Sequence, residues 1–141
     1  MDMERMNSLA DTGFIVALID SQDSHHREVK NIYLQQQKII VPQSVLAEVA
    51  YLLGCNAGIS SVIQFLRLLK TSRFELMALT EEDLSRIGDI LEEYQDSRVD
   101  FVDASVMAMA ERLNLTIILT LDRRDFSLYR PQNCTAFTLL P

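Results

Sequence analysis

The stretch Thr116–Leu121, TIILTL, is a nearly continuous run of leucine and β-branched residues. The stretch Lys38–Pro42, KIIVP, has much the same character. Strands with apolar side chains on both faces are usually buried inside a parallel sheet, because helices cover both sides of such sheets. The two stretches therefore predict a mostly parallel sheet that lies between two layers of helices.

The rest of the chain alternates between short apolar runs and longer helical patterns, which is typical of an α/β fold. No repeat or Pro/Gly-rich linker divides it, so we expect a single domain over residues 1–141 with a four- to five-stranded sheet in a three-layer α/β/α arrangement. Further strands are predicted at Ser8–Asp11, Phe74–Leu79 and Ala136–Leu140. Helices are predicted from Phe14, over Ser24–Gln36, Gln43–Cys55 and Ser60–Lys70, from Thr80 to about Tyr94, and from about Asp100 to Leu113.

Composition limits the class of protein. The chain has 141 residues with a hydrophobic content of 48%, both ordinary for one globular domain. Its N-terminus, MDMERMNS, does not read as a secretory signal, and no uninterrupted apolar span is long enough for a membrane helix, so a cytoplasmic location is expected. The 20 acids against 13 bases give a formal charge of −7, the wrong sign for holding nucleic acid by a general basic surface.

The two cysteines, Cys55 and Cys134, stand alone in dissimilar contexts. There is no C-x-x-C spacing and no histidine at ligand distance, so the sequence suggests neither a zinc site nor a disulfide framework. We expect both cysteines to be small residues of the core or to be half-buried.

Four acids that are far apart in the sequence are expected at one edge of the sheet. Asp11 ends the first predicted strand and Asp122 follows TIILTL. Glu48 lies in the early turns of the helix after KIIVP, and Asp103 lies in the first turn of the helix that leads into TIILTL. In a parallel sheet the connecting helices begin above the carboxyl edge of the strands, which is where α/β folds place their sites.

The helical position of Asp103 is unusual for an acid. It shares a face with the apolar residues Val106 and Ala110, and Glu48 lies at the margin of a similar apolar stripe, which predicts a half-buried side chain. A buried carboxylate must be protonated, paired or bound to a cation. No Lys or Arg occurs within Phe101–Ala110 to serve as a local partner.

A divalent cation would keep such a group of acids ionised. Ligation by oxygen alone, without His or Cys, favours Mg²⁺ or Mn²⁺. The usual chemistry of such a cluster is phosphoryl transfer or phosphodiester hydrolysis, in which the metal activates water and offsets charge on the phosphate. The metal would also supply the positive field that the overall composition lacks.

Each acid also has an ordinary structural interpretation. Asp100 could be the N-cap of its helix with Asp103 as the third helical residue reaching back to it, although an acid on the buried stripe fits that pairing less well. Asp11 could cap the helix that follows, and Asp122 could begin a turn. Asp125 could cap a loop or be an auxiliary acid at the rim of the site.

The chain contains, in order, the segments LADTGFIVALI, VPQSVLAEVAYLL, VDFVDASVMAMAERL and IILTLDRRDFSLYRP. Together they resemble the PIN-domain ribonucleases, and most closely the VapC-like toxins of type II toxin–antitoxin pairs. The resemblance implies a three-layer α/β/α domain and a Mg²⁺- or Mn²⁺-dependent endoribonuclease that leaves a 5′-phosphate and a 3′-hydroxyl. The four acids of the family correspond to Asp11, Glu48, Asp103 and Asp122, and none is replaced.

On this resemblance Asp11, Asp103 and Asp122 hold the principal metal, and Glu48 binds it directly or through water. Polar residues beside two of these acids match positions of the family that could orient a metal-bound water, and two further acids could support the site. Two arginines that follow Asp122 at once are the candidates for contact with RNA. The polar residues are Thr12 and Thr120, the supporting acids are Asp100 and Asp125, and the arginines are Arg123 and Arg124.

The resemblance also implies a homodimer and a cognate antitoxin that blocks the site. Two other functions stay open at this point. One is a PIN-domain nuclease of RNA processing, and the other is a receiver-like signalling module, which also gathers acids around Mg²⁺ at the carboxyl edge of a sheet. The receiver alternative fits the sequence poorly, because no Lys occurs beyond Lys70 and only a single acid follows the first strand.

Overall fold

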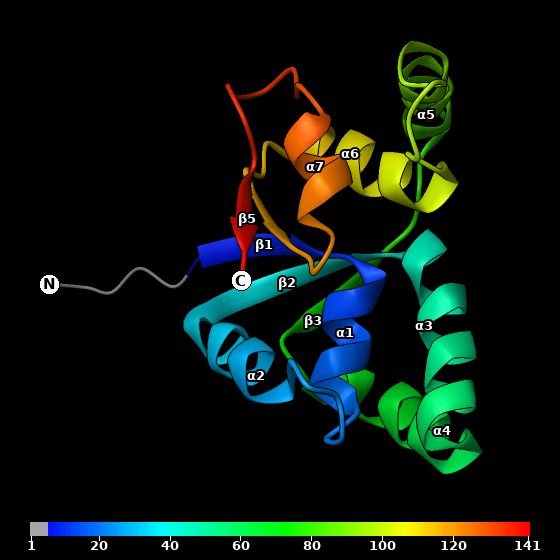
Figure 1. Ribbon diagram of the computed structural model, residues 1–141, viewed down its shortest axis with the longest axis vertical. Helices are drawn as coiled ribbons and strands as arrows, with labels where there is room; N and C mark the ends of the chain where they lie inside the picture. Colours follow the sequence, from blue (N-terminus) through cyan, green and yellow to red (C-terminus); the bar gives the residue numbers. More distant parts are fainter. Residues whose placement is uncertain (1–5) are drawn as a thin grey trace, which may run out of the picture.

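The computed structural model describes residues 6–141 and contains one parallel sheet (Figure 1). Its strand order is β3-β2-β1-β4-β5, and every neighbouring pair is parallel. Receiver-type domains have the order 2-1-3-4-5, so the receiver-like alternative is wrong. The strands are β1 (Met6–Ala10), β2 (Gln36–Pro42), β3 (Phe74–Met77), β4 (Ile117–Leu119) and β5 (Thr138–Leu140).

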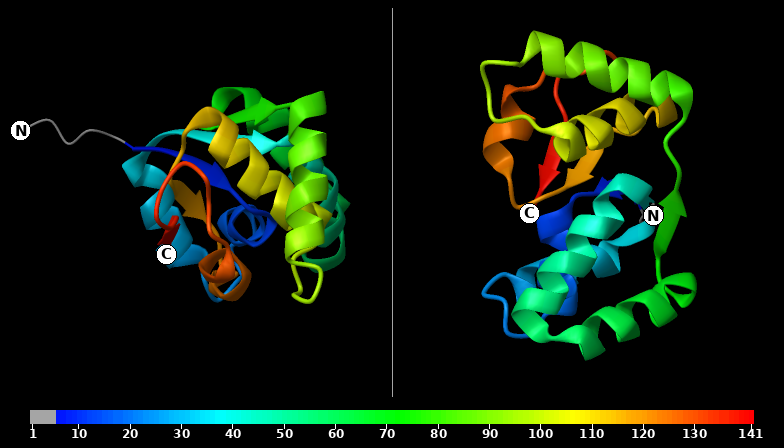
Figure 2. Two further views of the ribbon diagram at one scale, coloured as in Figure 1. Left: turned by 90° about the horizontal axis from the view of Figure 1, so that it is seen from above. Right: turned by 90° about the vertical axis from the view of Figure 1, so that its right-hand side faces the viewer.

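Helices cover both faces of the sheet, with α1 to α4 on one side and α5 and α6 on the other (Figures 1 and 2). The three-layer α/β/α prediction is therefore confirmed. Within residues 6–141 no helix has the length and apolar character needed to cross a membrane. The helices are α1 (Thr12–Ile19), α2 (His26–Gln35), α3 (Gln43–Ala57), α4 (Ile59–Leu68), α5 (Glu81–Glu93), α6 (Phe101–Leu113) and α7 (Arg123–Leu128), with a 3₁₀ turn, η1, at Leu69–Thr71.

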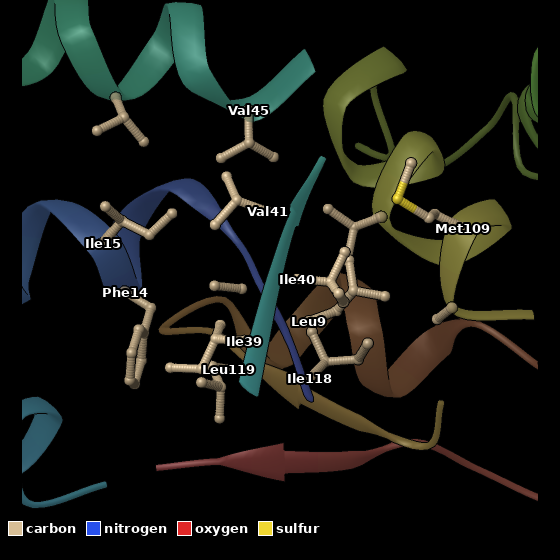
Figure 3. Packing of buried hydrophobic residues seen from close by; sticks show 14 of the residues in the cluster. Leu9, Phe14, Ile15, Ile39, Ile40, Val41, Val45, Met109, Ile118 and Leu119 are labelled. Atoms are coloured by element: carbon tan, nitrogen blue, oxygen red, sulfur yellow. The ribbon is translucent and has the colours of Figure 1, made fainter. Parts of the chain in front are cut away.

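The core lies on both faces of β2, as its sequence predicts. Successive side chains of a strand point to opposite faces, so Val41 packs against Ile15 and Val45 while Ile40 points toward Met109 (Figure 3). Ile40 and Val41 are 5% and 0% exposed. Burial on both faces explains why KIIVP shows no alternation of polar and apolar residues.

The largest error of the sequence analysis concerns the segment after β4. The sequence predicts a six-residue strand at Thr116–Leu121 followed by Asp122, but β4 covers only Ile117–Leu119 and Asp122 is the N-cap of the short helix α7. A helix of six residues has too few turns to show an apolar periodicity, so the polar sequence of Arg123–Leu128 resembles a turn. The strand predicted at Phe74–Leu79 likewise ends early, at Met77.

The expectation for one cysteine is also wrong. Cys55 is exposed, whereas Cys134 is half-buried as expected, and both are free thiols. Cys55 lies in the last turns of α3, whose apolar face toward the core is made instead by Val45, Val49 and Leu53. Its position on the outer face of that helix leaves the thiol in solvent.

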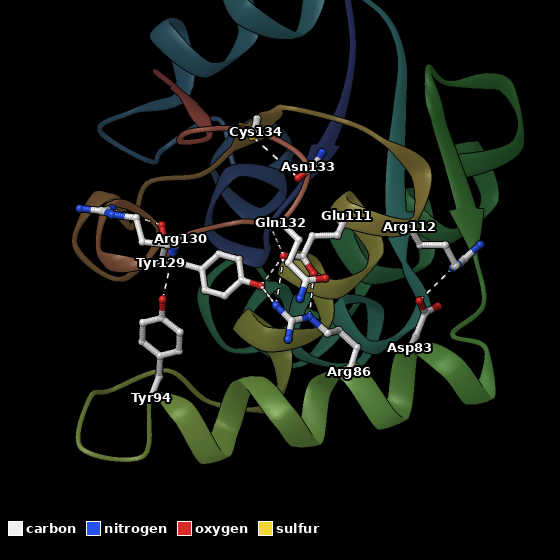
Figure 4. Close-up of polar contacts among 10 residues, drawn as sticks. All are labelled: Asp83, Arg86, Tyr94, Glu111, Arg112, Tyr129, Arg130, Gln132, Asn133 and Cys134. Atoms are coloured by element: carbon white, nitrogen blue, oxygen red, sulfur yellow. Dashed lines mark hydrogen bonds and ion pairs between the residues drawn. The ribbon is translucent and has the colours of Figure 1, made fainter.

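A network of charged and polar side chains fastens α5 and the end of α7 to α6 (Figure 4). Arg86 Nε donates to Glu111 Oε1 at 2.8 Å, and the Tyr129 hydroxyl donates to Glu111 Oε2 at 2.6 Å. A second ion pair joins Arg112 Nε to Asp83 Oδ1 at 2.8 Å. The helix that carries Asp103 is thereby joined to the helix that follows Asp122.

The Asp83–Arg112 pair should make the protein sensitive to acid. Burial raises the pKa of Asp83, but hydrogen bonds from Arg112 and from the backbone N–H of Thr80 outweigh burial and lower it below its ordinary value. A lowered folded-state pKa gives stability that is present above the unfolded-state pKa, about 3.9, and is lost as pH falls through the folded value.

We predict that Asp83→Asn lowers the free energy of unfolding by about 1–3 kcal/mol at pH 7, because it removes a charge-assisted hydrogen bond. The difference from the parent should be smaller at about pH 3, because the stability that the ionised parent carboxylate provides is lost as pH falls below the unfolded-state pKa of about 3.9. Urea unfolding at the two pH values measures both quantities. Asp89→Asn, on the exposed side of α5, is the control; an equal loss at both pH values would contradict the prediction.

Candidate active site

An open cleft of about 590 Å³ lies at the carboxyl edge of the sheet. The four acids predicted for the site all line it, together with Thr12, Asp100 and Asp125. Residues more than a hundred positions apart therefore meet at one place, as the strand and helix pattern requires. The complete lining is Asp11, Thr12, Gly13, Glu48, Leu52, Arg98, Asp100, Asp103, Leu121, Asp122 and Asp125.

Asp11 lies between β1 and α1, with its backbone held by the neighbouring strand. Its N–H donates to the carbonyl of Leu119 at 2.9 Å. It occupies the N-cap position of α1, but its side chain makes no capping hydrogen bond and instead accepts from Thr120 Oγ1 at 3.2 Å. Burial raises the pKa of Asp11 to about 6, with smaller contributions in the same direction from Glu48 and Asp122.

The Thr120 hydroxyl connects two of the acids. It donates to Asp11 Oδ2 and accepts from the backbone N–H of Asp122 at 2.9 Å. Thr120 itself is 0% exposed and lies just after β4. Thr120 is predicted from the sequence to orient water at the site. In the structure its hydrogen bonds fix the position of Asp11 relative to Asp122.

Asp100 and Asp103 form a capping box at the start of α6. The Asp103 N–H donates to Asp100 Oδ1 at 2.9 Å, and the Asp100 N–H donates to Asp103 Oδ2 at 3.2 Å. The expectation that Asp103 fits the buried stripe better than a capping pair is therefore wrong. The first turn of α6 lies at the open edge of the sheet, so its inner face meets the cleft, and Asp103 is only partly buried.

Asp103 nevertheless has a strongly perturbed carboxyl group. Burial raises its pKa to about 8, and the negative charges of Asp100 and Asp11 act in the same direction, against the lowering effect of the Asp100 N–H. At neutral pH the group therefore favours either a proton or a cation.

A third aspartate completes a compact group of oxygens. The carboxylates of Asp103, Asp122 and Asp125 each offer one oxygen, and these three atoms lie within 4.8 Å of one another. Asp122 also accepts from the Asp125 N–H at 3.3 Å as the N-cap of α7. Asp125 is only 7% exposed, and burial and the charge of Asp122 both raise its pKa.

Glu48 is exposed, which corrects the expectation that it is half-buried. It lies on α3, where the margin of the apolar stripe faces the open cleft and not the core, and its charge contributes to the raised pKa of Asp11. Neither Glu48 nor Asp11 belongs to the compact group of three oxygens. Both acids therefore line the cleft outside that group.

Two features fit an oxygen-ligated cation. Ligand oxygens at about 2.1 Å from an octahedral ion lie about 3 Å apart when adjacent and about 4 Å apart when opposite. The three carboxylate oxygens, all within 4.8 Å of one another, are close enough together to share one ion. In addition, Thr12 Oγ1 is buried beside the cleft without a hydrogen-bond partner among the described residues. A buried hydroxyl of this kind costs about 1–3 kcal/mol unless something in the cleft satisfies it.

The arginines are arranged differently from the prediction. The Arg123 guanidinium donates to the carbonyls of Leu139 and Pro141, so it fastens the C-terminal strand. Arg124 is exposed and has no ion pair among residues 6–141. Arg98, which the sequence analysis missed, lines the cleft. Its position two residues before the helix cap Asp100 was the signal that could have placed it there.

The sequence model of the PIN domain family matches residues 9–130 of this chain. The chain belongs to the PIN domain family. The resemblance found in the sequence is therefore confirmed, and the matched range contains every acid of the cleft.

Individual PIN domain proteins are also similar to this chain in sequence and in structure. The chain is 31% identical over 134 residues to ribonuclease VapC26 of Mycobacterium tuberculosis, covering 94% of this chain and 99% of that one. The crystal structure of M. tuberculosis VapC20, described as a toxin that cleaves the sarcin-ricin loop, superposes with a TM-score of 0.76 at 18% identity, covering 83% of this chain and 91% of that one.

A second solved structure, VapBC2 of Rickettsia felis bound to a DNA fragment from its promoter, superposes with a TM-score of 0.67 at 18% identity. The match covers 95% of this chain and 97% of that one. At these identities the structural likeness supports the fold.

The raised pKa of Asp103 gives a testable consequence. When the pKa of a carboxyl is higher in the folded than in the unfolded state, the protein loses stability as pH rises from the unfolded-state pKa to the folded-state pKa. For Asp103 this range runs from about 4 to about 8. In EDTA, Asp103→Asn should therefore raise the melting temperature by at least about 2 °C more at pH 8 than at pH 5. Thermal unfolding with Asp89→Asn as control measures this, and an equal change at both pH values would refute it.

Proposed function

We propose that this PIN domain protein is a divalent-metal-dependent endoribonuclease and the toxin of a type II toxin–antitoxin pair, with residues 1–141 acting as a single domain. The observation that carries the proposal is the group of three carboxylate oxygens from Asp103, Asp122 and Asp125 within 4.8 Å. Asp11 and Glu48 line the same cleft. The curated relative at 31% identity is named as a ribonuclease, which supports the reaction class.

The residues of the cleft fit Mg²⁺ or Mn²⁺. The acidic side chains that line the cleft offer only oxygen atoms as metal ligands, and neither His nor Cys is among the lining residues. Asp103, Asp122 and Asp125 would hold the ion, with Asp11 and Glu48 as further ligands directly or through water. When bound, it would activate water and offset negative charge on the phosphate.

The protein's own residues prepare this site. Thr120 fixes Asp11 relative to Asp122, and the capping box fixes Asp103 relative to Asp100. These hydrogen bonds hold carboxylates that repel one another, so little rearrangement is needed on binding. Thr12 would place its unpaired hydroxyl against a water of the site.

We predict that Asp103→Asn lowers the rate of Mg²⁺-dependent cleavage of a 5′-labelled RNA by at least about a hundredfold, because an amide is a poor ligand for a divalent cation. Asp125→Asn should have a comparable effect, because Asp125 is one of the three proposed ligands, and Asp89→Asn should have none. Cleavage is followed on denaturing gels, and circular dichroism shows whether each variant is folded. Cleavage by folded Asp103→Asn at the parental rate would exclude this site.

The proposed partner is a cognate antitoxin, and we also propose a homodimer and a cytoplasmic location. Solved neighbours of this fold include a toxin–antitoxin complex from Klebsiella pneumoniae and VapBC of Salmonella typhimurium bound to DNA.

We predict that a small DNA-binding protein encoded immediately upstream, when co-expressed, purifies with this chain and suppresses RNA cleavage. Size-exclusion chromatography and the gel assay test this. RNA cleavage that such a protein does not suppress would instead favour RNA processing.

A further inference from the structure

The charge of the cleft presents a problem for the proposed substrate. Six acidic residues line the cleft and one basic residue, Arg98, accompanies them. RNA carries one negative charge per phosphate, so its approach to this cleft is opposed by the acids even after a single divalent ion has bound. Some cation must contact the RNA backbone beside the acids.

Arg98 is held in position by its neighbours. The Ser97 hydroxyl donates to the carbonyl of Tyr94 at 2.6 Å and accepts from the Val99 N–H at 3.2 Å. Val99 is 9% exposed, which anchors the chain on the other side. Arg98 is thus an exposed side chain on a short, fixed segment directly before the capping box of α6.

The positive charge of Arg98 is not in an ion pair within the described part of the chain. No carboxylate lies within 4.0 Å of its guanidinium among the described residues, and it makes no hydrogen bond there. Arg98 lines the cleft beside the acids. Arg124 lies on α7 directly before Asp125 in the chain, is exposed, and has no ion pair within residues 6–141.

The neighbouring arginines differ from these two, because each is engaged by the protein itself. Arg86 and Arg112 are in ion pairs with Glu111 and Asp83. Arg123 and Arg130 donate to backbone carbonyls near the C-terminal end of the chain. Arg98 and Arg124 are therefore the arginines around α6 and α7 whose guanidinium groups remain available.

We propose that Arg98 is a substrate-binding residue that contacts an RNA phosphate next to the scissile bond, with Arg124 also contacting the RNA backbone. The inference rests on the proposed ribonuclease function and names the residues by which the acidic cleft holds a polyanion. A guanidinium suits this task, because its planar fork can donate two hydrogen bonds to one phosphate. Arg98 then replaces Arg123 as the expected contact.

The alternative is that Arg98 only neutralises the acids and leaves RNA untouched. Removing a neutralising charge would change the affinity of the acids for a cation without changing RNA binding. Removing a phosphate contact would weaken RNA binding and reduce its dependence on salt, since each contact contributes about 0.7 to the slope for single strands. The two explanations can therefore be separated by measuring both ligands.

The first measurement is RNA binding without hydrolysis. A fluorescein-labelled single-stranded RNA is titrated with Asp103→Asn protein in EDTA at about 50 to 200 mM salt, and fluorescence anisotropy gives Kd. Adding Arg98→Ala should raise Kd about tenfold and reduce the salt slope by about 0.7. Arg98→Lys should keep the slope, and Arg27→Ala, on the exposed surface of α2, should change neither quantity.

The second measurement uses active protein with Mg²⁺. Arg98→Ala should raise KM for RNA about tenfold and leave kcat within about twofold, because the metal ligands are intact. Calorimetric titration with Mn²⁺ shows whether the acids still bind the cation, and a change in Mn²⁺ affinity without a change in RNA Kd would mark the alternative. Unchanged RNA Kd, salt slope and KM in Arg98→Ala would overturn the inference. Absence of cleavage by the parent protein would instead refute the proposed function.

Discussion

The burial of several carboxylates close to one another at the carboxyl edge of the sheet is the constraint around which this site is built. Burial and neighbouring negative charge raise the pKa of Asp11 to about 6 and that of Asp103 to about 8. The protein offsets the cost with hydrogen bonds to the carboxylates from the Thr120 hydroxyl and from the backbone N–H of Asp100. The remaining stability comes from the core on both faces of the sheet.

Two acidic side chains outside the cleft, Asp83 and Glu111, have the opposite shift in pKa. Glu111 accepts from Arg86, Tyr129 and the backbone N–H of Gln132, and these bonds outweigh its burial and lower its pKa. A buried acid with partners stabilises the packing of α5 and α7 on α6, whereas the acids of the cleft have few donors. This contrast distinguishes structural carboxylates from those available to a ligand.

Much of this arrangement was predictable. The apolar runs KIIVP and TIILTL determine a parallel sheet covered on both faces, and that topology alone places the ends of β1 and β4 beside the start of α6. The meeting of Asp11, Glu48, Asp103 and Asp122 in one cleft follows from it. Periodicity could not find α7, because a helix of six residues is shorter than the pattern needed to recognise it.

The sequence by itself determined the fold class and which acids share one edge, because strand burial and helix direction are local properties of the chain. Only the tertiary structure decided how each side chain is used. It placed Asp125 with Asp103 and Asp122 and left Arg98 free beside them. Arg123 has the same charge as Arg98, yet it is engaged by carbonyls sixteen and eighteen residues away. Such distinctions depend on distances between distant segments, which no local pattern encodes.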